Sequence, residues 1–362
     1  MSQLPPLQPL EYLDPARFET PAILKRLVAA HRALAEFKGV AASMPNQDIL
    51  LSTLGLQEAK DSSEIENIVT THDELFREAM QDAASPAAKE VARYNRALRV
   101  GFEAVRNTRL LTSNHIVEIQ SELEKNRAGY RKLPGTVLKS GTGRVVYTPP
   151  TPELLPGLMS DLERFINDDE HWAADPLVKM ALIHHQFESI HPFYDGNGRA
   201  GRIVNVLYLV KEGLLESPVL YLSRAIVRSK ADYYHLLQAV RELDQWEEWV
   251  LYMLGVVRDT AIDGIASIQA IKAALMDYKH RIRDGYKFYS QDLINNLFSH
   301  PYTKIEFLQR DLEISRLTAT RYLDALVEGG LLRKLKAGRS NYYINEPLYR
   351  ILTEETLPAG IS

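Results

Sequence analysis

The chain has 362 residues, of which 45% are hydrophobic and 25% charged, as in an ordinary globular protein of two or three domains. A formal net charge of -4 argues against a protein that coats nucleic acid. The lack of cysteine excludes disulfides, thiolate metal sites and a cysteine nucleophile. The start, MSQLPPLQPL, has no basic or apolar segment, and apolar runs such as WVLYMLGVV fall short of the roughly 20 residues of a membrane span. We therefore expect a cytoplasmic protein without membrane contact.

The N-terminal part of the chain has helical periodicity after a proline-rich arm of about 20 residues. From Pro21 to about Val105, apolar residues recur at spacings of three and four, as in ILKRLVAAHRALAEF. Ser85 and Pro86 suit the N-cap and the first position of a further helix. This region is expected to be mainly helical.

A short β-hairpin is predicted next, because glycine and β-branched residues gather in LPGTVLKSGTGRVVYTPP. Its strands are expected at Val137–Lys139 and Arg144–Tyr147, and the charged stretch 124–132 before it is interpreted as a solvated turn. Helical periodicity resumes from Pro152 to about Val257, with a break near Ser217 and a loop at His191. The body of the protein is therefore predicted to be mainly α.

The C-terminal part has the outline of a winged helix-turn-helix: a short helix, a turn, a second helix ended by two glycines, and two strands around Gly338. From Pro301 to Asn345 there are eight Lys or Arg against five Asp or Glu, a surplus of three. DNA-binding winged helices usually carry a stronger basic stripe. DNA contact and a docking or dimerising role both remain open, as does a homodimer.

The loop HPFYDGNGRAGR lies between two apolar helical patterns and combines groups for chemistry on a nucleotide. Its Gly-Asn-Gly stretch precedes a helix, where free backbone N–H groups form an anion-binding nest. Arg199 and Arg202, three residues apart, can reach one polyphosphate. Asp195 offers an oxygen ligand to Mg²⁺, and His191 can take a proton near neutral pH. These parts indicate transfer from a nucleotide to a hydroxyl.

The loop resembles the signature of the Fic (Fido-domain) protein adenylyltransferases, H-x-F-x-[DE]-G-N-G-R-x-x-R, at every fixed position. The resemblance implies AMP transfer from ATP, with His191 as the base that deprotonates a Tyr, Ser or Thr hydroxyl of a target protein, and Asp195 as the Mg²⁺ ligand. It also implies that Arg199 binds the β-phosphate and Arg202 the γ-phosphate. The nucleotide-binding residues would be Gly196, Asn197, Gly198, Arg199, Ala200, Gly201 and Arg202, with Phe193 anchoring the loop in the core. Glycine at position 198 is typical of AMP transfer, whereas kinase-like relatives have lysine.

Two further segments agree with this resemblance. The hairpin is similar to the Fic flap, which holds the target segment by β-addition through Val145, Val146 and Tyr147. The segment KADYYHLL is similar to the adenine-side segment, in which Tyr233, Tyr234 and Leu237 would line the base. Some relatives have asparagine where this chain has Arg241, which leaves the far wall of that pocket undefined.

The stretch SSEIENI has two interpretations. Ser63 and Glu66 have the spacing of a capping box at a helix N-terminus. Ser62, Glu66 and Asn67 also match the inhibitory motif of the Fic family, [ST]-x-x-x-E-[GN], which would lie over the nucleotide site. The resemblance then implies that Glu66 pairs with Arg202 and denies it to the γ-phosphate.

The expected domains are a helical region at 1–105, a catalytic core at 106–258 with the flap at 134–150, a helical linker at 259–289 and a winged helix at 290–362. Three alternatives to AMP transfer are considered: a zinc site at His184, His185, Glu188 and His191, a DNA-binding regulator with a nucleotide-sensing Fic domain, and a de-AMPylating enzyme. Zinc is disfavoured because His191 lies past the helix end and the two adjacent histidines face different ways. The target protein and the choice among ATP, UTP and GTP are not written in the sequence.

Overall fold

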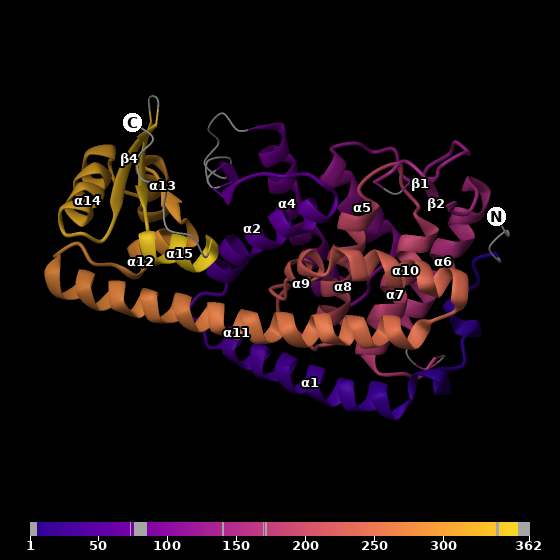
Figure 1. Ribbon diagram of the computed structural model, residues 1–362. Coiled ribbons are helices and arrows are strands. Elements are labelled where there is room, and N and C mark those ends of the chain that lie inside the picture. The colour runs from indigo at the N-terminus through magenta and orange to yellow at the C-terminus, as the bar shows by residue number, and fades with distance from the viewer. Residues whose placement is uncertain are drawn as a thin grey trace. The chain divides into compact units, whose positions relative to one another are not determined.

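The computed structural model describes residues 6–72, 74–75, 85–139, 141–168, 170, 172–337 and 340–353 (Figure 1). The chain divides into two compact units. The first comprises residues 1–38, 61–68 and 93–262, and the second comprises 39–60, 69–92 and 263–362. Both units are mainly helical, which confirms the predicted fold class.

The first unit is a helical assembly whose centre is formed by α7 and α8, the two helices that flank the HPFYDGNGRAGR loop. Every residue of α7 after its first is buried, including polar residues such as Lys179, His184 and Glu188. Helix α5 packs on α8, and α6 packs on α7. The helices that lie entirely in this unit are η1 Leu10–Tyr12, η2 Pro15–Phe18, α5 Ser113–Glu124, η3 Pro152–Leu154, α6 Leu155–Asn167, α7 Pro176–Ile190, α8 Asn197–Lys211, α9 Ser223–Arg228 and α10 Lys230–Leu243. Parts of α1 Pro21–Ala42, α2 Asp48–Ile65, α4 Pro86–Thr108 and α11 Trp246–Gly285 also belong to it.

The predicted hairpin is present, and each strand is one residue shorter at its start than expected. Strands β1 Leu138–Lys139 and β2 Val145–Tyr147 are antiparallel, with a shift of register between Leu138 and Lys139. The side chain of Tyr147 is buried, whereas that of Val146 is 40% exposed. Ser140 of the connecting turn lies outside the described residues. One face of the flap thus packs on the first unit and the other is open.

The second unit contains the C-terminal helices and a three-stranded sheet of order β3-β5-β4, in which neighbouring strands are antiparallel. The hydroxyl of Ser315 accepts a hydrogen bond from the N–H of Thr318 and so caps α14. The arrangement is compatible with a winged helix-turn-helix, although the predicted Gly338 turn lies outside the described residues. The elements are α12 Gln291–Ser299, β3 Tyr302–Thr303, α13 Ile305–Leu312, α14 Arg316–Glu328, β4 Arg333–Ala337, β5 Ser340–Ile344 and α15 Glu346–Thr353.

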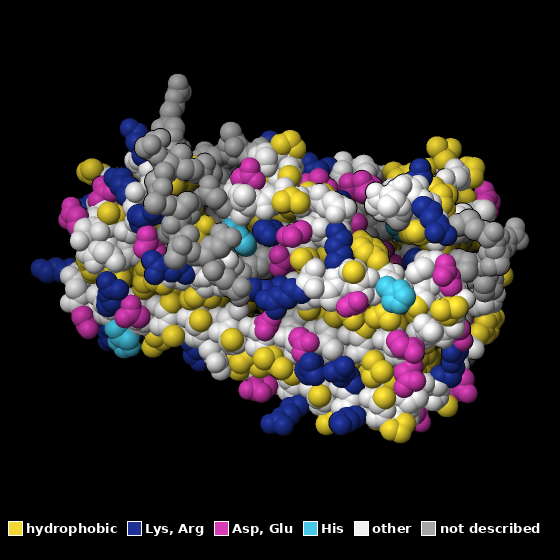
Figure 2. Space-filling model, in the orientation of Figure 1, with side chains coloured by type: hydrophobic (Ala, Val, Ile, Leu, Met, Phe, Trp, Pro, Cys, Tyr) yellow, Lys and Arg dark blue, Asp and Glu magenta, His cyan; other side chains and the backbone are white. Residues whose placement is uncertain are grey.

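Basic side chains of this C-terminal segment have acidic partners. Arg316 Nη1 lies 2.9 Å from Glu306 Oε1, and Lys334 Nζ lies 2.7 Å from Asp324 Oδ1. Basic and acidic side chains are mixed on the face of the molecule that Figure 2 shows. DNA contact therefore stays a prediction. No helix in the described part of the chain combines the length and the apolar character that crossing a bilayer requires.

Candidate active site

The loop between α7 and α8 is fixed by its backbone and by one amide side chain. His191 ends α7 in the left-handed conformation at φ 47°, and its N–H donates to Phe187 O at 3.0 Å. Gly196, at φ 79°, is the N-cap of α8, a conformation that glycine adopts without strain. The side chain of Asn197 bonds both the N–H and the C=O of Phe193 at 2.9 Å. Asn197 thus holds the loop closed by its side chain, and Phe193 is fully buried as predicted.

His191 is kept uncharged by its surroundings. Burial, and after it the positive charges of Arg241 and Arg131, lower the pKa of this histidine to about 4. Nε of Arg131 donates to the carbonyl of His191 at 2.9 Å, and a second nitrogen of Arg131 donates to Pro150 O at the base of the flap. The imidazole is therefore neutral at physiological pH and can accept a proton.

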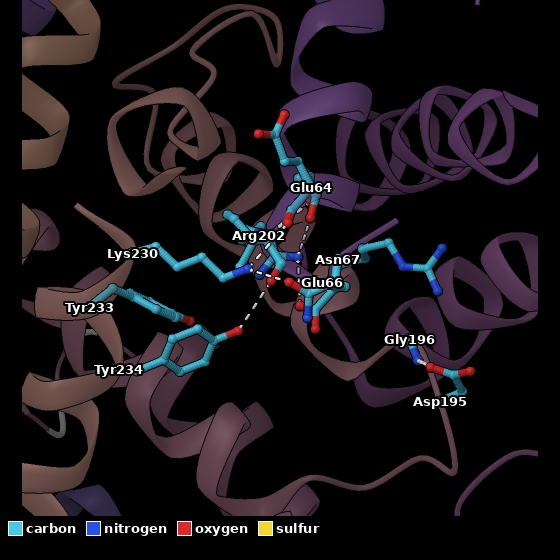
Figure 3. Close-up of polar contacts among 12 residues, drawn as sticks. Glu64, Glu66, Asn67, Asp195, Gly196, Arg202, Lys230, Tyr233 and Tyr234 are labelled. Carbon is cyan, nitrogen blue, oxygen red and sulfur yellow. Dashed lines mark hydrogen bonds and ion pairs between the residues drawn. The ribbon is translucent and has the colours of Figure 1, made fainter. Parts of the chain in front are cut away.

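Arg202 lies in the core of the first unit, 2% exposed, and contacts the end of α2 (Figure 3). Its Nε donates to Ser62 Oγ at 2.8 Å, and its Nη2 donates to Ser62 O at 2.8 Å and to Glu66 Oε1 at 2.9 Å. Burial alone would lower the pKa of Arg202, but the charge of Glu66, together with smaller contributions from Tyr233, Tyr94 and Glu188, raises it. The predicted pairing of Glu66 with Arg202 is confirmed.

Glu66 also reaches the glycine nest. Helix α2 ends at Ile65, and Glu66 and Asn67 form the turn that follows it. A Cβ placed on Gly198 would collide with Oε1 of Glu66, so this carboxylate oxygen lies against the backbone of the nest. The capping-box interpretation is wrong, because Ser63 belongs to the last turn of α2 and not to a helix start.

The turn after α2, which contacts α8 through Arg202, is also contacted by helix α10 (Figure 3). Nζ of Lys230 lies 2.9 Å from Asn67 Oδ1 and 3.3 Å from Glu64 O, and the hydroxyl of Tyr234 lies 3.4 Å from Ile65 O. Lys230 was not anticipated as a site residue, because only the folded chain brings α10 to the end of α2. Its place at the start of KADYYHLL is the one signal in the sequence.

Only one of the three residues expected at the adenine is open to solvent. Tyr234 is 45% exposed, whereas Tyr233 is 1% and Leu237 3% exposed. The hydroxyl of Tyr233 lies 2.8 Å from His184 Nε2, so this side chain is part of the core. Tyr233 and Leu237 lie on the buried face of α10, and their role in lining the base stays a prediction.

Arg199 forms an ion pair that the sequence interpretation missed. Its Nη2 lies 2.6 Å from Oε1 of Glu124, the last residue of α5, and the two side chains are 2% and 13% exposed. Arg131, at the other end of the stretch 124–132, is also 2% exposed. The interpretation of this stretch as a solvated turn is wrong at these two residues, because each binds the α7–α8 loop. Nothing in the sequence of this charged stretch indicates that Glu124 and Arg131 are buried.

Asp195 is exposed and lies beside the nest. Its Oδ1 accepts the N–H of Gly196 at 2.7 Å, and its carbonyl accepts from Gln120 Nε2 at 3.2 Å. An exposed carboxylate next to an anion nest fits Mg²⁺ bound together with phosphates. Within the described residues, no group of three or more His, Asp or Glu side chains could hold a metal, so the zinc alternative finds no support.

Arg241 joins the flap to the end of α7. Its guanidinium stacks over the ring of Tyr147 at 4.0 Å, its Nε donates to Ser189 Oγ at 3.0 Å and its Nη2 donates to Glu188 O at 3.2 Å. The hydroxyl of Tyr147 donates to Ser189 O at 2.9 Å. The carbonyl of Val146 accepts from Gln238 Nε2, also at 2.9 Å. The flap strand β2 is thereby held at the C-terminal end of α7, and Val145 is half-buried.

Ala200 and Gly201, the remaining residues of the motif, lie in the first turns of α8. Ala200 is fully buried, and a Cβ on Gly201 would lie 2.7 Å from Oε1 of Glu188. Glycine at 201 therefore lets α8 approach α7 closely. Burial raises the pKa of Glu188 to about 7. The role of Ala200 and Gly201 in nucleotide binding stays a prediction.

Three family models match the chain: Fic/DOC family N-terminal at residues 24–103, Fic/DOC family at 110–209, and the C-terminal domain of SoFic-like protein adenylyltransferases at 275–348. A probable protein adenylyltransferase of Aquifex aeolicus is 31% identical over 174 residues, which are 46% of this chain and 51% of that protein. Protein adenylyltransferase Fic of Drosophila melanogaster is 37% identical over 98 residues, 27% of this chain and 19% of that protein. The chain thus spans about half the length of the first relative and about a fifth of the second.

Solved structures show the same fold. A Fic family protein of Desulfovibrio desulfuricans G20 has a TM-score of 0.59 at 21% identity, and the match covers 92% of this chain and 98% of that one. Fic-1 of Caenorhabditis elegans has a TM-score of 0.54 at 21% identity, covering 68% of this chain and 72% of that one. The loop signature, the buried α7–α8 pair, the flap and the three matching models agree, and the chain belongs to the Fic/DOC family.

Proposed function

We propose that this protein is an adenylyltransferase that transfers AMP from ATP to a hydroxyl side chain of a target protein or of itself. The observation that carries the proposal is the neutral His191 at the edge of a glycine nest whose two arginines already bind carboxylates. Those carboxylates mark the nest as a site for anions. Relatives named protein adenylyltransferases support the same reaction.

In the proposed step, His191 takes the proton of the target hydroxyl, and the hydroxyl oxygen bonds to the α-phosphorus of ATP. The bond from that phosphorus to the bridging oxygen breaks, and pyrophosphate leaves. The free N–H groups at the start of α8 and the two arginines bind the phosphates. Mg²⁺ bound at Asp195 would neutralise phosphate charge.

The flap presents the target. Strand β2 is held on its buried face by the stacking of Arg241 on Tyr147, while Val146 on the opposite face is exposed. A target segment that adds to the edge of the hairpin would be held by its main chain, which tolerates many sequences. Tyr234 is the exposed aromatic of α10 available to the base of the nucleotide.

The same site is proposed to be autoinhibited within the chain. Glu66 and Ser62 take three hydrogen bonds of Arg202, and Glu66 lies against Gly198. A γ-phosphate would need both the guanidinium and this space, so Glu66 and productively bound ATP exclude each other. Lys230 and Tyr234 hold the inhibitory turn in place.

Incubation with labelled ATP, Mg²⁺ and cell lysate tests the function. Labelled protein bands that disappear with His191→Ala support AMP transfer. Label transferred from GTP or UTP but not from ATP would show that the nucleotide substrate is not ATP. Loss of AMP from a modified target without any transfer would favour the reverse reaction. No label with wild type or with Glu66→Gly would contradict the proposal.

A further inference from the structure

We propose that Glu124 is a second inhibitory carboxylate, which occupies the β-phosphate half of the nucleotide site as Glu66 occupies the γ-phosphate half. The inference rests on the proposed function, because it takes Arg199 and Gly196 as phosphate-binding groups. Productive binding of ATP would then require both carboxylates to leave, one from α5 and one from the turn after α2.

The position of the Glu124 carboxylate is that of an anion in the nest. Its Oε1 lies 2.6 Å from Nη2 of Arg199. A Cβ placed on Gly196 would lie 2.7 Å from the same oxygen, so the oxygen lies against the backbone at the N-terminus of α8. One carboxylate oxygen thus contacts both groups that a phosphate oxygen would use.

The carboxylates of Glu124 and Glu66 make equivalent contacts with successive parts of the start of α8. Glu124 covers Gly196 and pairs with Arg199, three residues later. Glu66 covers Gly198 and pairs with Arg202, four residues later. Each carboxylate therefore lies over one glycine and is bound by the arginine one helical turn further on. Together they fill the stretch that a chain of phosphates would follow.

The helix dipoles indicate that Glu124 does not serve to stabilise its own helix, α5. It is the last residue of α5, and a carboxylate at the negative end of a helix is unfavourable. Its side chain instead reaches the positive end of α8. The neighbouring Glu122 differs, because it pairs with Arg96 and Lys125 at the surface of the same helix.

Arg199 needs an anion at this position, since a charged side chain that is 2% exposed is costly without an opposite charge. Glu124 supplies that charge in the absence of nucleotide. A β-phosphate would supply it in the complex, and both cannot occupy the oxygen position over Gly196. Glu124 is therefore a competitor of the phosphate.

Binding of ADP and AMP by calorimetry tests this inference without requiring transfer. ADP carries the β-phosphate but no γ-phosphate, so Glu66 does not interfere, and AMP lacks both. Glu124→Gln should raise the affinity for ADP about tenfold and change that for AMP less than twofold. Glu122→Gln, on the same helix, should change neither. Unchanged or weaker ADP binding in Glu124→Gln would overturn the inference and make Glu124 a positioning residue for Arg199.

A second variant covers the case in which Glu124→Gln does not fold. Glu124→Asp keeps a negative charge near Arg199 but shortens the side chain by one methylene, so it should also tighten ADP binding, by a smaller factor. ADP affinity equal to wild type would contradict the inference. The double variant Glu66→Gly,Glu124→Gln separates this inference from the proposed function. If it binds ADP more tightly than wild type but transfers no AMP, the proposed function is refuted, while competition between Glu124 and the β-phosphate still stands.

Discussion

Nη2 of Arg202 lies 2.9 Å from Oε1 of Glu66, across 136 residues of sequence. The same guanidinium also bonds the hydroxyl and the carbonyl of Ser62, so one short segment takes three of its hydrogen bonds. Charge-assisted bonds at a buried site are strong. This contact makes Arg202 the point at which nucleotide binding and inhibition compete.

Replacing His191 by alanine should abolish AMP transfer and leave ATP affinity within about twofold, because the imidazole acts on the target hydroxyl and not on the nucleotide. Transfer of label from ATP and calorimetry with ATP check the two parts. Near wild-type transfer by His191→Ala would remove this residue from the role of base.

Arg202→Lys should weaken ATP binding more than AMP binding. Lysine keeps the buried positive charge but lacks the planar pair of donors that fits a phosphate. The loss is expected to be about tenfold for ATP in a Glu66→Gly background, and AMP is the internal control. Equal losses for both nucleotides would move Arg202 away from the γ-phosphate.

Lys230→Gln should loosen the inhibitory turn, because Nζ of Lys230 bonds Asn67 Oδ1 and Glu64 O. A partly exposed hydrogen bond contributes about 0.5–1 kcal/mol, which corresponds to a two- to fivefold rise in basal transfer. The rise should vanish in a Glu66→Gly background. A fall in transfer by the single variant would show that Lys230 supports catalysis instead.

His184 should make stability depend on pH. Burial, and after it the charge of Arg202, lower its pKa to about 3, so the unfolded state, with a pKa of 6.5, binds protons more readily. Stability is therefore lost as pH falls below about 6.5, by roughly 2 kcal/mol between pH 7 and pH 5 for this group. Urea unfolding at both pH values, compared with His184→Gln, measures it. An identical pH slope in the variant would exclude His184 as the cause.

The parts of the site that lie within a contiguous motif could be predicted from the sequence. The loop from His191 to Arg202 folds as a helix end, a nest and a helix start, because its glycines and spacing determine this locally. The Glu66–Arg202 pair was predicted through the family motif. The mainly helical body and the flap followed from periodicity and β-branched residues.

Contacts that depend on packing alone could not be predicted. Glu124 and Arg131 stand in a charged stretch that has the composition of a surface turn, yet both reach the loop from α5 and the segment after it. Lys230 reaches Asn67 only because α10 lies beside the end of α2. The contact of the Tyr233 hydroxyl with His184 likewise follows from packing alone.

Glu66→Gly compared with Glu64→Gln tests the central claim most directly. Glu64 is two residues away in the last turn of α2, and the group of this residue that bonds Lys230 is its carbonyl. Each 1.4 kcal/mol of lost competition is about tenfold in productive ATP occupancy, so removal of the Glu66 carboxylate should raise transfer tens of fold. Glu64→Gln should match wild type. Labelled ATP at equal folded concentrations gives the answer on one gel, and bands of equal intensity for Glu66→Gly and wild type would contradict the account.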